Sequence, residues 1–294
     1  MRGQIRKAVS GFYYVYANNQ MYQTRARGNF RKRKIIPLVG DIVEFDSGNL
    51  VDGYILEVLS RKNVLDHPPV ANVDGGIIVM SAVEPVFSLN LLDRFLVTLE
   101  EKEIEPLIYL TKIDLLGKEE CDELAKVVQV YRNIGYTVIF PRNEKDALKE
   151  LTSYFVDCLW VVMGQTGTGK STLLNKLSPD LRLAAGEISK SLGRGKHTTR
   201  YVQLLSLYDG LVADTPGFSS IDFLEIRAEE LSKYFPEFVD ASEYCRFSEC
   251  SHTHEPKCEV KLCVERGDIA LSRYNNYWQF LDEINGRRVT YKKK

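Results

Sequence analysis

The stretch CLWVVMGQTGTGKSTLLNKL, residues 158–177, decides the fold class of this chain. An apolar run of strand length precedes a G-x-x-x-x-G-K-S loop and a helical pattern follows it, which is the context in which such a loop wraps a phosphate. Its glycines let backbone N–H groups point inward, and the start of the helix adds further free N–H groups. A phosphate-binding loop is therefore expected, with contacts from Gly164, Gln165, Thr166, Gly167, Thr168, Gly169, Lys170, Ser171 and Thr172.

Three side chains and one backbone group near these phosphates have specific expected roles. Lys170 should reach the β- and γ-phosphates of a nucleotide, and the Ser171 hydroxyl should ligate Mg²⁺. The stretch GLVADTPG, residues 210–217, ends another apolar run with D-x-x-G, which in isolation is a common turn. At about forty residues after a phosphate loop, it predicts that Asp214 holds Mg²⁺, directly or through water, and that the Gly217 N–H contacts the γ-phosphate.

The basic segment GRGKHTTR, residues 193–200, lies between these two motifs and is expected to form a mobile loop. A threonine in such a loop can complete the Mg²⁺ shell while γ-phosphate is present and release it after hydrolysis. Thr198 and Thr199 are both candidates for this ligand, and the sequence does not choose between them.

A further motif, LTKIDLL at residues 110–116, precedes the phosphate loop. An aspartate fixed at a strand end can accept hydrogen bonds from N1 and N2 of guanine, which adenine cannot offer as a pair. We therefore expect a guanine-reading loop of Thr111, Lys112, Ile113 and Asp114, with Lys112 lying along the purine face. The motif usually begins with Asn and follows the phosphate loop. Either this copy is a surface coincidence or the domain is circularly permuted.

The surrounding pattern predicts a multi-domain chain with a central α/β domain. Apolar runs of buried-strand length alternate with amphipathic helical patterns from about residue 74, which indicates a mostly parallel sheet with helices on both faces. Before it, several short strands within residues 1–68 favour a small β-barrel, with an OB-fold as the leading candidate. The stretch DHPPVANVDG, residues 66–75, is expected to be a linker, because consecutive prolines block helix and central strand. After residue 217 helices are expected over AEELSKYFPEF and at about 268–285.

The charge of the chain is unevenly distributed. The whole chain has a net charge of −1, yet residues 1–40 carry nine Lys or Arg and no Asp or Glu. A locally basic segment suits a polyanion-binding surface, and the alternative is an ordinary solvated loop. The candidate RNA-binding residues are Arg31, Lys32, Arg33 and Lys34.

Four of the six cysteines lie close together near the C-terminus, at positions 245, 250, 258 and 263. Because a cytosolic chain is expected, its six cysteines do not indicate a disulfide scaffold, and Cys121 and Cys158, in apolar surroundings, are expected in the core. The clustered cysteines, with histidines between them, indicate a metal site. The chain has no run of eighteen or more apolar residues and no apolar core of signal-peptide length at its start, so we expect no membrane span and a cytoplasmic location.

The order of these motifs resembles one family, the ribosome small-subunit-dependent GTPases called RsgA (also YjeQ or YloQ). The resemblance covers essentially the whole chain and rests on TKIDLL, GQTGTGKSTLLN, GRGKHTTR, DTPGF and CRFSECSHTHEPKC. It implies an OB-fold RNA-binding domain at 1–68, a circularly permuted GTPase domain at 69–222 and a helical zinc-binding domain at 223–294. It also implies a GTPase whose hydrolysis is stimulated by the 30S subunit during late maturation of that subunit.

The family pattern also implies functions for individual residues. The zinc pattern falls on Cys245, Cys250, His252 and Cys258, a closed tetrahedral set with His254 as a competing ligand and Cys263 as a spare thiol. Phe218 replaces the glutamine that orients water in many GTPases, so slow intrinsic hydrolysis is expected. His197 is the candidate catalytic residue.

Two departures from the usual GTPase motifs affect the guanine pocket: Thr111 replaces Asn, and PRNEKDAL at 141–148 replaces a Ser-Ala backing of the base. A monomer is expected, and guanosine tetraphosphate alarmones are possible further ligands. Two rival functions are a metal chaperone and a guanine-nucleotide-sensing RNA-binding protein with little catalysis. Because the chain leads from DTPG to the zinc domain, we hypothesise that nucleotide switching shifts that domain.

Overall fold

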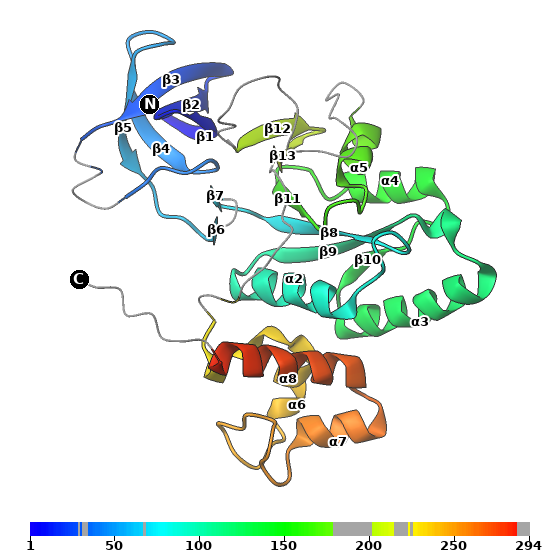
Figure 1. Ribbon diagram of the computed structural model, residues 1–294. Helices are drawn as coiled ribbons and strands as arrows, with labels where there is room; N and C mark the ends of the chain where they lie inside the picture. The colour runs from blue at the N-terminus through cyan, green and yellow to red at the C-terminus, as the bar shows by residue number, and fades with distance from the viewer. Residues whose placement is uncertain are drawn as a thin grey trace.

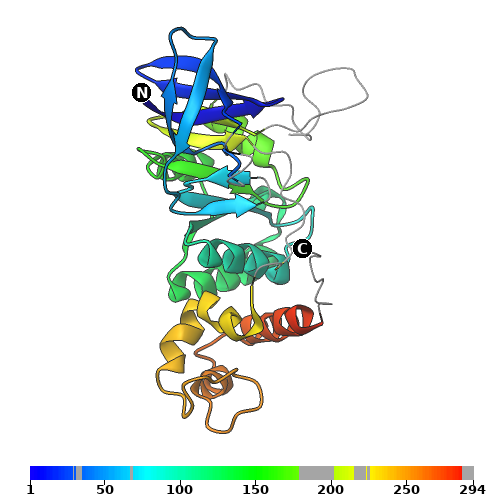
Figure 2. The same ribbon diagram turned by 90° about the vertical axis from the view of Figure 1, so that its left-hand side faces the viewer.

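The computed structural model describes residues 1–28, 30, 35–66, 69–178, 202–214, 223 and 226–286. Figure 1 shows these residues as a column, with a strand-rich barrel at one end, a sheet flanked by helices in the middle and a helical region at the other end. The view in Figure 2 shows the same order of layers from the side.

The N-terminal region is a five-stranded barrel, as the sequence predicts. Its strands are β1 (Arg2–Val9), β2 (Phe12–Ala17), β3 (Gln20–Ala26), β4 (Ile42–Asp46) and β5 (Gly53–Val58). β1, β2 and β3 pair antiparallel, β3 pairs parallel with β5, and the pairing of β4 with both β5 and β1 closes the barrel. The fully buried side chains of Val15, Val43 and Phe45 fill its interior. The predicted OB-type barrel is therefore confirmed.

The segment expected to be a linker contains a small two-stranded sheet instead. β6 (Val64–Asp66) and β7 (Pro69–Ala71) pair antiparallel, with Asp66 opposite Pro69. The expectation was wrong because a proline is tolerated as the first residue of a short edge strand, where no ladder hydrogen bond depends on its missing N–H.

The central sheet has the predicted parallel strands. They are β8 (Gly75–Ser81), β9 (Glu105–Thr111), β10 (Thr137–Ile139), β11 (Leu159–Met163) and β13 (Gly210–Asp214), in the order β10-β9-β8-β11-β13. Every residue of β8 and β11 is buried, as expected for strands covered on both faces. β12 (Gln203–Leu207) runs antiparallel at the edge and also pairs with β1 through Lys7 and Gln203, so the barrel and the central sheet are continuous.

Helices cover both faces of this sheet (Figure 1). α2 (Leu89–Glu101) and α3 (Lys118–Ile134) pack on the face that bears Ile78 and Met80. α4 (Glu144–Thr152) and α5 (Lys170–Leu177) pack on the face that bears Ile77 and Val79. The parallel strands thus end together, with Ser81 opposite Thr111, and bring their carboxyl-end loops to one edge.

The C-terminal region is helical, but its first helix is broken. Over AEELSKYFPEF the chain forms the 3-10 helix η3 (Ala228–Tyr234) and then α6 (Pro236–Ser242), because Pro236 cannot continue a preceding helix. α7 (Glu259–Arg266) was not anticipated, and α8 (Leu271–Asn285) begins three residues later than expected. Val97 of α2 belongs to the same buried cluster as Phe235 and Phe280, so this region packs directly on the central domain.

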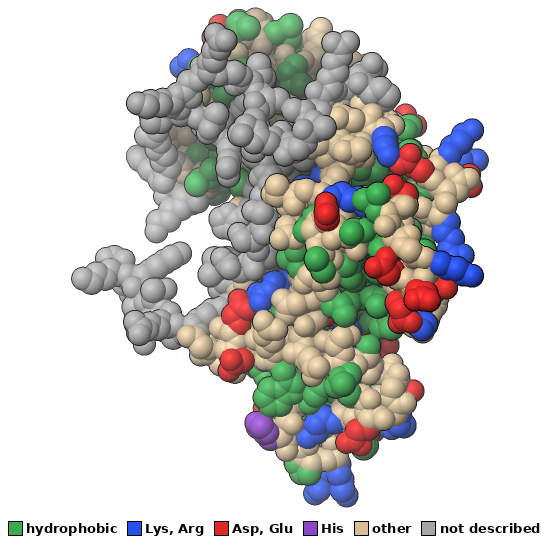
Figure 3. Space-filling model, turned by 45° about the vertical axis from the view of Figure 1, so that its right-hand side comes forward, with side chains coloured by type: hydrophobic (Ala, Val, Ile, Leu, Met, Phe, Trp, Pro, Cys, Tyr) green, Lys and Arg blue, Asp and Glu red, His purple; other side chains and the backbone are tan. Residues whose placement is uncertain are grey.

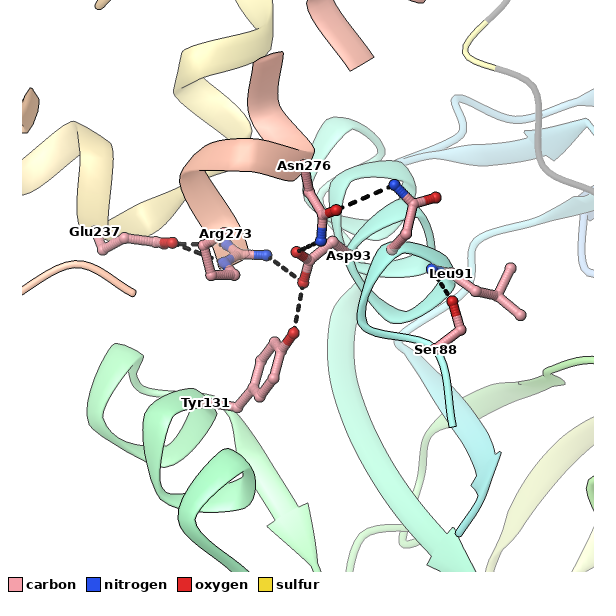
Figure 4. Close-up of polar contacts among 8 residues, drawn as sticks. Ser88, Leu91, Asp93, Tyr131, Glu237, Arg273 and Asn276 are labelled. Carbon is pink, nitrogen blue, oxygen red and sulfur yellow. Dashed lines mark hydrogen bonds and ion pairs between the residues drawn. The ribbon is translucent and has the colours of Figure 1, made fainter. Parts of the chain in front are cut away.

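A buried polar network joins the same two regions (Figure 4). The fully buried Arg273 of α8 donates to Asp93 of α2 at 2.8 Å and to Glu237 of α6 at 2.7 Å. Asp93 also accepts from Tyr131 of α3 at 2.7 Å and from Asn276 of α8 at 2.6 Å. Because every charge in this set has an opposite charge or hydrogen bond beside it, the interface tolerates ions that would be costly alone.

No helix in the described ranges is both long and apolar enough to cross a membrane. The three domain ranges expected from the sequence stay predictions, since the boundary at 222 and 223 adjoins residues outside the described part of the chain.

Candidate functional site

The phosphate loop joins the buried end of β11 to the first residue of α5, as the sequence predicts. Gly164 has a φ of +138°, and a Cβ on it would lie 2.3 Å from the carbonyl oxygen of Val79 on neighbouring β8. Only glycine fits this close approach without moving backbone. Gly169, with a φ of +92°, caps α5, so the free N–H groups of that helix begin at Lys170.

Backbone carbonyl groups of the phosphate loop hold the Lys170 side chain over that loop. Its Nζ donates to the carbonyl oxygens of Gly164 at 2.7 Å and Gln165 at 2.8 Å, and the residue is 7% exposed. Burial lowers the pKa of Lys170 to about 8, because the ammonium loses contact with water. A phosphate beside this ammonium would supply the missing negative charge.

The base-reading motif lies against the phosphate loop. The Thr111 hydroxyl, at the end of β9, donates to the carbonyl oxygen of Thr168 at 2.6 Å. The Thr168 hydroxyl, 1% exposed, in turn donates to the carbonyl oxygen of Gln165 at 2.9 Å. Two motifs about fifty residues apart are therefore tied by consecutive hydrogen bonds, and a threonine hydroxyl makes this link where the usual residue is asparagine.

The rest of the motif turns away from the sheet. Lys112 has a φ of +57° and its Nζ donates to the carbonyl oxygen of Glu84, in the loop that follows β8. The short 3-10 helix η1 (Ile113–Leu115) follows and leaves the Asp114 carboxylate exposed at the carboxyl edge of the sheet. An exposed, acceptor-only group at this position is able to bind the N–H groups of a base.

A pocket of about 430 Å³ brings these pieces together, a size typical of small-ligand sites. Its walls come from the end of β9 with η1, from the loop between β10 and α4, and from α5. The lining residues are Tyr109, Leu110, Thr111, Lys112, Ile113, Asp114, Pro141, Arg142, Glu144, Gly169, Thr172, Leu173 and Lys176. Burial, and to a lesser degree the charge of Glu144, raises the pKa of Tyr109 to about 12, so its hydroxyl stays protonated there.

The pocket residues of the β10–α4 loop and those in the later turns of α5 were not among the predicted site residues. The sequence does contain an indication for the loop at 141–144. This loop follows a predicted parallel strand, and loops at that end of a strand line the ligand crevice. The prediction for this loop was limited to the departure of PRNEKDAL from the usual Ser-Ala motif.

The expected magnesium ligands are only partly described. Ser171, 7% exposed, is the second residue of α5 and adjoins the phosphate loop. Asp214 ends β13, whose Ala213 is in parallel register with Val161 of β11, so its backbone lies at the same edge. Thr198, Thr199, Gly217, His197 and Phe218 lie outside the described residues, as do Arg31, Lys32, Arg33 and Lys34.

The C-terminal region contains a compact Cys₃His cluster. The ligand atoms of Cys245, Cys250, His252 and Cys258 all lie within 4.8 Å of one another. His252 Nδ1 is 3.5 Å from Cys258 Sγ and 3.8 Å from Cys245 Sγ. Bonds of about 2.3 Å from a tetrahedral zinc to sulfur put ligand atoms about 3.8 Å apart, so this donor set fits a closed metal site.

Without a metal, the pKa values of these groups favour neutral thiols and a neutral imidazole. Burial raises the pKa of Cys250 to about 12, raises the pKa of Cys258 and lowers that of His252. A neutral imidazole is ready to ligate, whereas the buried thiols need a cation to become thiolates. Hydrogen bonds hold the backbone of this loop, since Tyr274 donates to the carbonyl oxygen of His252 and Tyr277 to that of Ser251, both at 2.7 Å.

The two alternative ligands lie outside this cluster. The exposed His254 ring packs edge-on against Trp278 with centroids 5.3 Å apart. The Cys263 sulfur accepts from Arg266 at 3.1 Å. The cluster therefore consists of the four residues that the family pattern implies.

Comparisons with known proteins agree with this arrangement. The RsgA GTPase family model matches residues 58–224, and the RsgA N-terminal domain model matches residues 2–55. A curated small ribosomal subunit biogenesis GTPase RsgA from Enterococcus faecalis is 64% identical over 294 residues, which cover 100% of this chain and 99% of that relative. The protein of the same name from Streptococcus pneumoniae is 53% identical over 293 residues, covering 100% and 98%.

Two crystal structures have the same overall architecture. YloQ, a circularly permuted GTPase, superposes with a TM-score of 0.82 at 42% identity, covering 99% of this chain and 96% of YloQ. YjeQ from Thermotoga maritima superposes with a TM-score of 0.84 at 35% identity, covering 98% and 99%. The permuted motif order inferred from the sequence is confirmed, and the chain belongs to the RsgA family of circularly permuted GTPases.

Proposed function

We propose that this chain hydrolyses GTP to GDP and phosphate while bound to the small ribosomal subunit, and that this assists maturation of the subunit. The observation that carries the proposal is the convergence of the base-reading loop and the phosphate loop on one pocket, tied by the hydrogen bond from Thr111 to Thr168. The curated relatives named as small ribosomal subunit biogenesis GTPases supply the biological context.

In this proposal each part of the pocket has one task. Asp114 accepts from the base and Lys112 lies along it. The phosphate loop, 164–172, donates its N–H groups to the phosphates, joined by the Gly217 N–H, and Lys170 neutralises the β- and γ-phosphates. Ser171, Asp214 and one of Thr198 and Thr199 would hold Mg²⁺, which offsets the charge that develops on the phosphate oxygens.

The hydrolytic step itself is assigned to groups outside the described residues. We propose that His197 orients the attacking water or the loop around it, because Phe218 has no hydrogen-bonding group to do so. Intrinsic turnover is then slow, and the missing group is supplied by another part of the chain or by the subunit.

RNA contact is proposed for the barrel. Cations lie over aromatic rings across β1, β2 and β3: Arg6 over Tyr16 at 4.6 Å, Lys7 over Tyr14 at 5.7 Å and Arg25 over Phe12 at 4.5 Å. Rows of cations and rings suit a nucleic acid strand, and Arg31, Lys32, Arg33 and Lys34 would extend them. By contrast, the face of the central domain in Figure 3 has acidic and basic side chains interspersed, without an extended basic area.

The Cys₃His cluster is proposed to hold one structural zinc ion. Support comes from the absence of an open ligand position in a closed set of three thiols and one imidazole. We further propose that the chain acts as a cytoplasmic monomer, and that its pocket accepts guanosine tetraphosphate as well as GDP, since the two share the base and the diphosphate.

Binding to purified small subunits tests this function. We expect tighter binding with a non-hydrolysable GTP analogue than with GDP, and a loss of affinity with rising salt as counterions compete for RNA. Equal affinity in both nucleotide states would contradict a nucleotide-controlled role. Metal analysis that finds about one zinc per chain in wild type and in Cys263→Ser, but not in Cys258→Ser, would support the zinc assignment.

A further inference from the structure

Within the part of the chain that the structure describes, the motif at 111–114 offers a partner for one half of the guanine edge. Guanine presents the N1 and N2 hydrogens as donors, and O6 and N7 as acceptors. The Asp114 carboxylate can only accept, so it satisfies the donor side and leaves O6 and N7 without a partner. A base that enters the pocket therefore needs a hydrogen-bond donor opposite Asp114.

Two positions of the β10–α4 loop that line the pocket, Pro141 and Arg142, cannot supply that donor from their backbone. Pro141 has no N–H. The N–H of Arg142 is already engaged, because it donates to the carbonyl oxygen of Phe140 at 2.9 Å. The Ser-Ala sequence that commonly backs the base is absent from this loop, so a backbone N–H from these two positions is not available.

Three cationic side chains line the pocket, and two of them have partners. Lys112 Nζ donates to the carbonyl oxygen of Glu84, and Lys176 pairs with the carboxylate of Glu144. Arg142 is exposed, and within the described part of the chain its guanidinium has no hydrogen bond or ion pair. Its Cζ lies 5.9 Å from the centroid of the Phe140 ring.

We propose that the Arg142 guanidinium reads O6 and N7 of guanine, and that Asp114 and Arg142 together select the base. A planar guanidinium matches these two acceptors with two parallel N–H groups, which is the commonest specific contact of proteins with guanine. Adenine places an amino group where guanine has O6, so the same arginine disfavours ATP. This inference rests on the proposed function, since it assumes that guanine nucleotides bind in this pocket.

The test compares wild type with Arg142→Ala, using GDP, 6-thio-GDP and ADP near pH 7. The thio analogue keeps the N1 and N2 hydrogens but replaces O6 with sulfur, a weak acceptor. We expect wild type to prefer GDP over 6-thio-GDP. In Arg142→Ala the GDP affinity should fall by about tenfold or more, the 6-thio-GDP affinity should change much less, and the ratio of GDP to ADP affinity should shrink.

Lys145→Ala is the matched control, because Lys145 is exposed at the start of α4 and does not line the pocket. It should leave all three affinities unchanged. An equal loss for GDP and 6-thio-GDP in Arg142→Ala would overturn the proposal in favour of a phosphate or ribose contact, and no loss would overturn it outright. Failure of the proposed function looks different, since wild type itself would then not prefer GDP to ADP.

Discussion

The hydroxyl of Thr111 donates a hydrogen bond of 2.6 Å to the carbonyl oxygen of Thr168. Thr111 ends a strand that precedes the phosphate loop in the chain, and Thr168 lies within that loop, so this bond joins the two halves of the nucleotide site. The replacement of asparagine by threonine therefore keeps a donor at the position that fixes one loop against the other. In the proposed site, the residues that would contact the base and those that would contact the phosphates are therefore fixed relative to one another.

Removing this donor should weaken nucleotide binding. Thr111→Val keeps the shape of the side chain but leaves the Thr168 carbonyl oxygen without its partner, which costs about 1–3 kcal/mol. We expect GDP affinity to fall by about tenfold by equilibrium titration. Thr111→Ser keeps the hydroxyl and should bind GDP nearly as wild type does; a valine variant with unchanged affinity would show that the bond does not order the pocket.

Nucleotide affinity should depend on pH through Lys170. In the free protein burial lowers the pKa of this ammonium to about 8, and bound phosphates raise it again. Above that pH the free lysine is neutral and binding must take up a proton, so affinity should decrease by up to about tenfold per pH unit, while below about pH 7 it should be flat.

Titration of GDP between pH 6 and 9 measures this dependence. Lys170→Met should bind weakly with the pH slope removed, which separates Lys170 from other titrating groups. A flat wild-type profile across the same range would mean that the ammonium stays charged in the free protein.

The buried Asp93–Arg273 pair should fix the helical region on α2. In Arg273→Met both Asp93 and Glu237 lose their cation while remaining buried, which costs about 3–5 kcal/mol. Denaturant unfolding followed through Trp278, on α8, should shift to lower concentration. Lys126→Ala, which removes an exposed pair with Glu123, serves as the control and should cause no shift. A stable Arg273→Met protein would show that apolar packing alone secures this interface.

This interface bears on the hypothesis that nucleotide switching shifts the C-terminal helical region. Because α2 and α8 share the network of Asp93, Arg273 and Asn276, a displacement of the helical region must carry α2 or break these bonds. If α2 moves with the helical region, the loop between β8 and α2, which holds Glu84 beside Lys112, is part of the motion.

The sequence predicted the strands and their motifs because strands buried on both faces read as apolar runs, and ligand loops follow their ends. It predicted the barrel from several short strands within fewer than 70 residues. It did not predict the β6–β7 pair, since the consecutive prolines were taken to mark a linker, or the break at Pro236. The Asp93–Arg273 pair was missed because it joins helices 180 residues apart. An acidic residue beside Leu92 on the apolar face of α2 was its only local signal.

The central claim is that this pocket hydrolyses GTP under control of the small subunit. Phosphate release from GTP, measured with and without purified small ribosomal subunits at saturating magnesium, tests it most directly. We expect slow release by the protein alone, an increase of at least about tenfold with subunits, and loss of most of that increase in His197→Ala with GDP affinity retained. Release that is equal with and without subunits would contradict the claim.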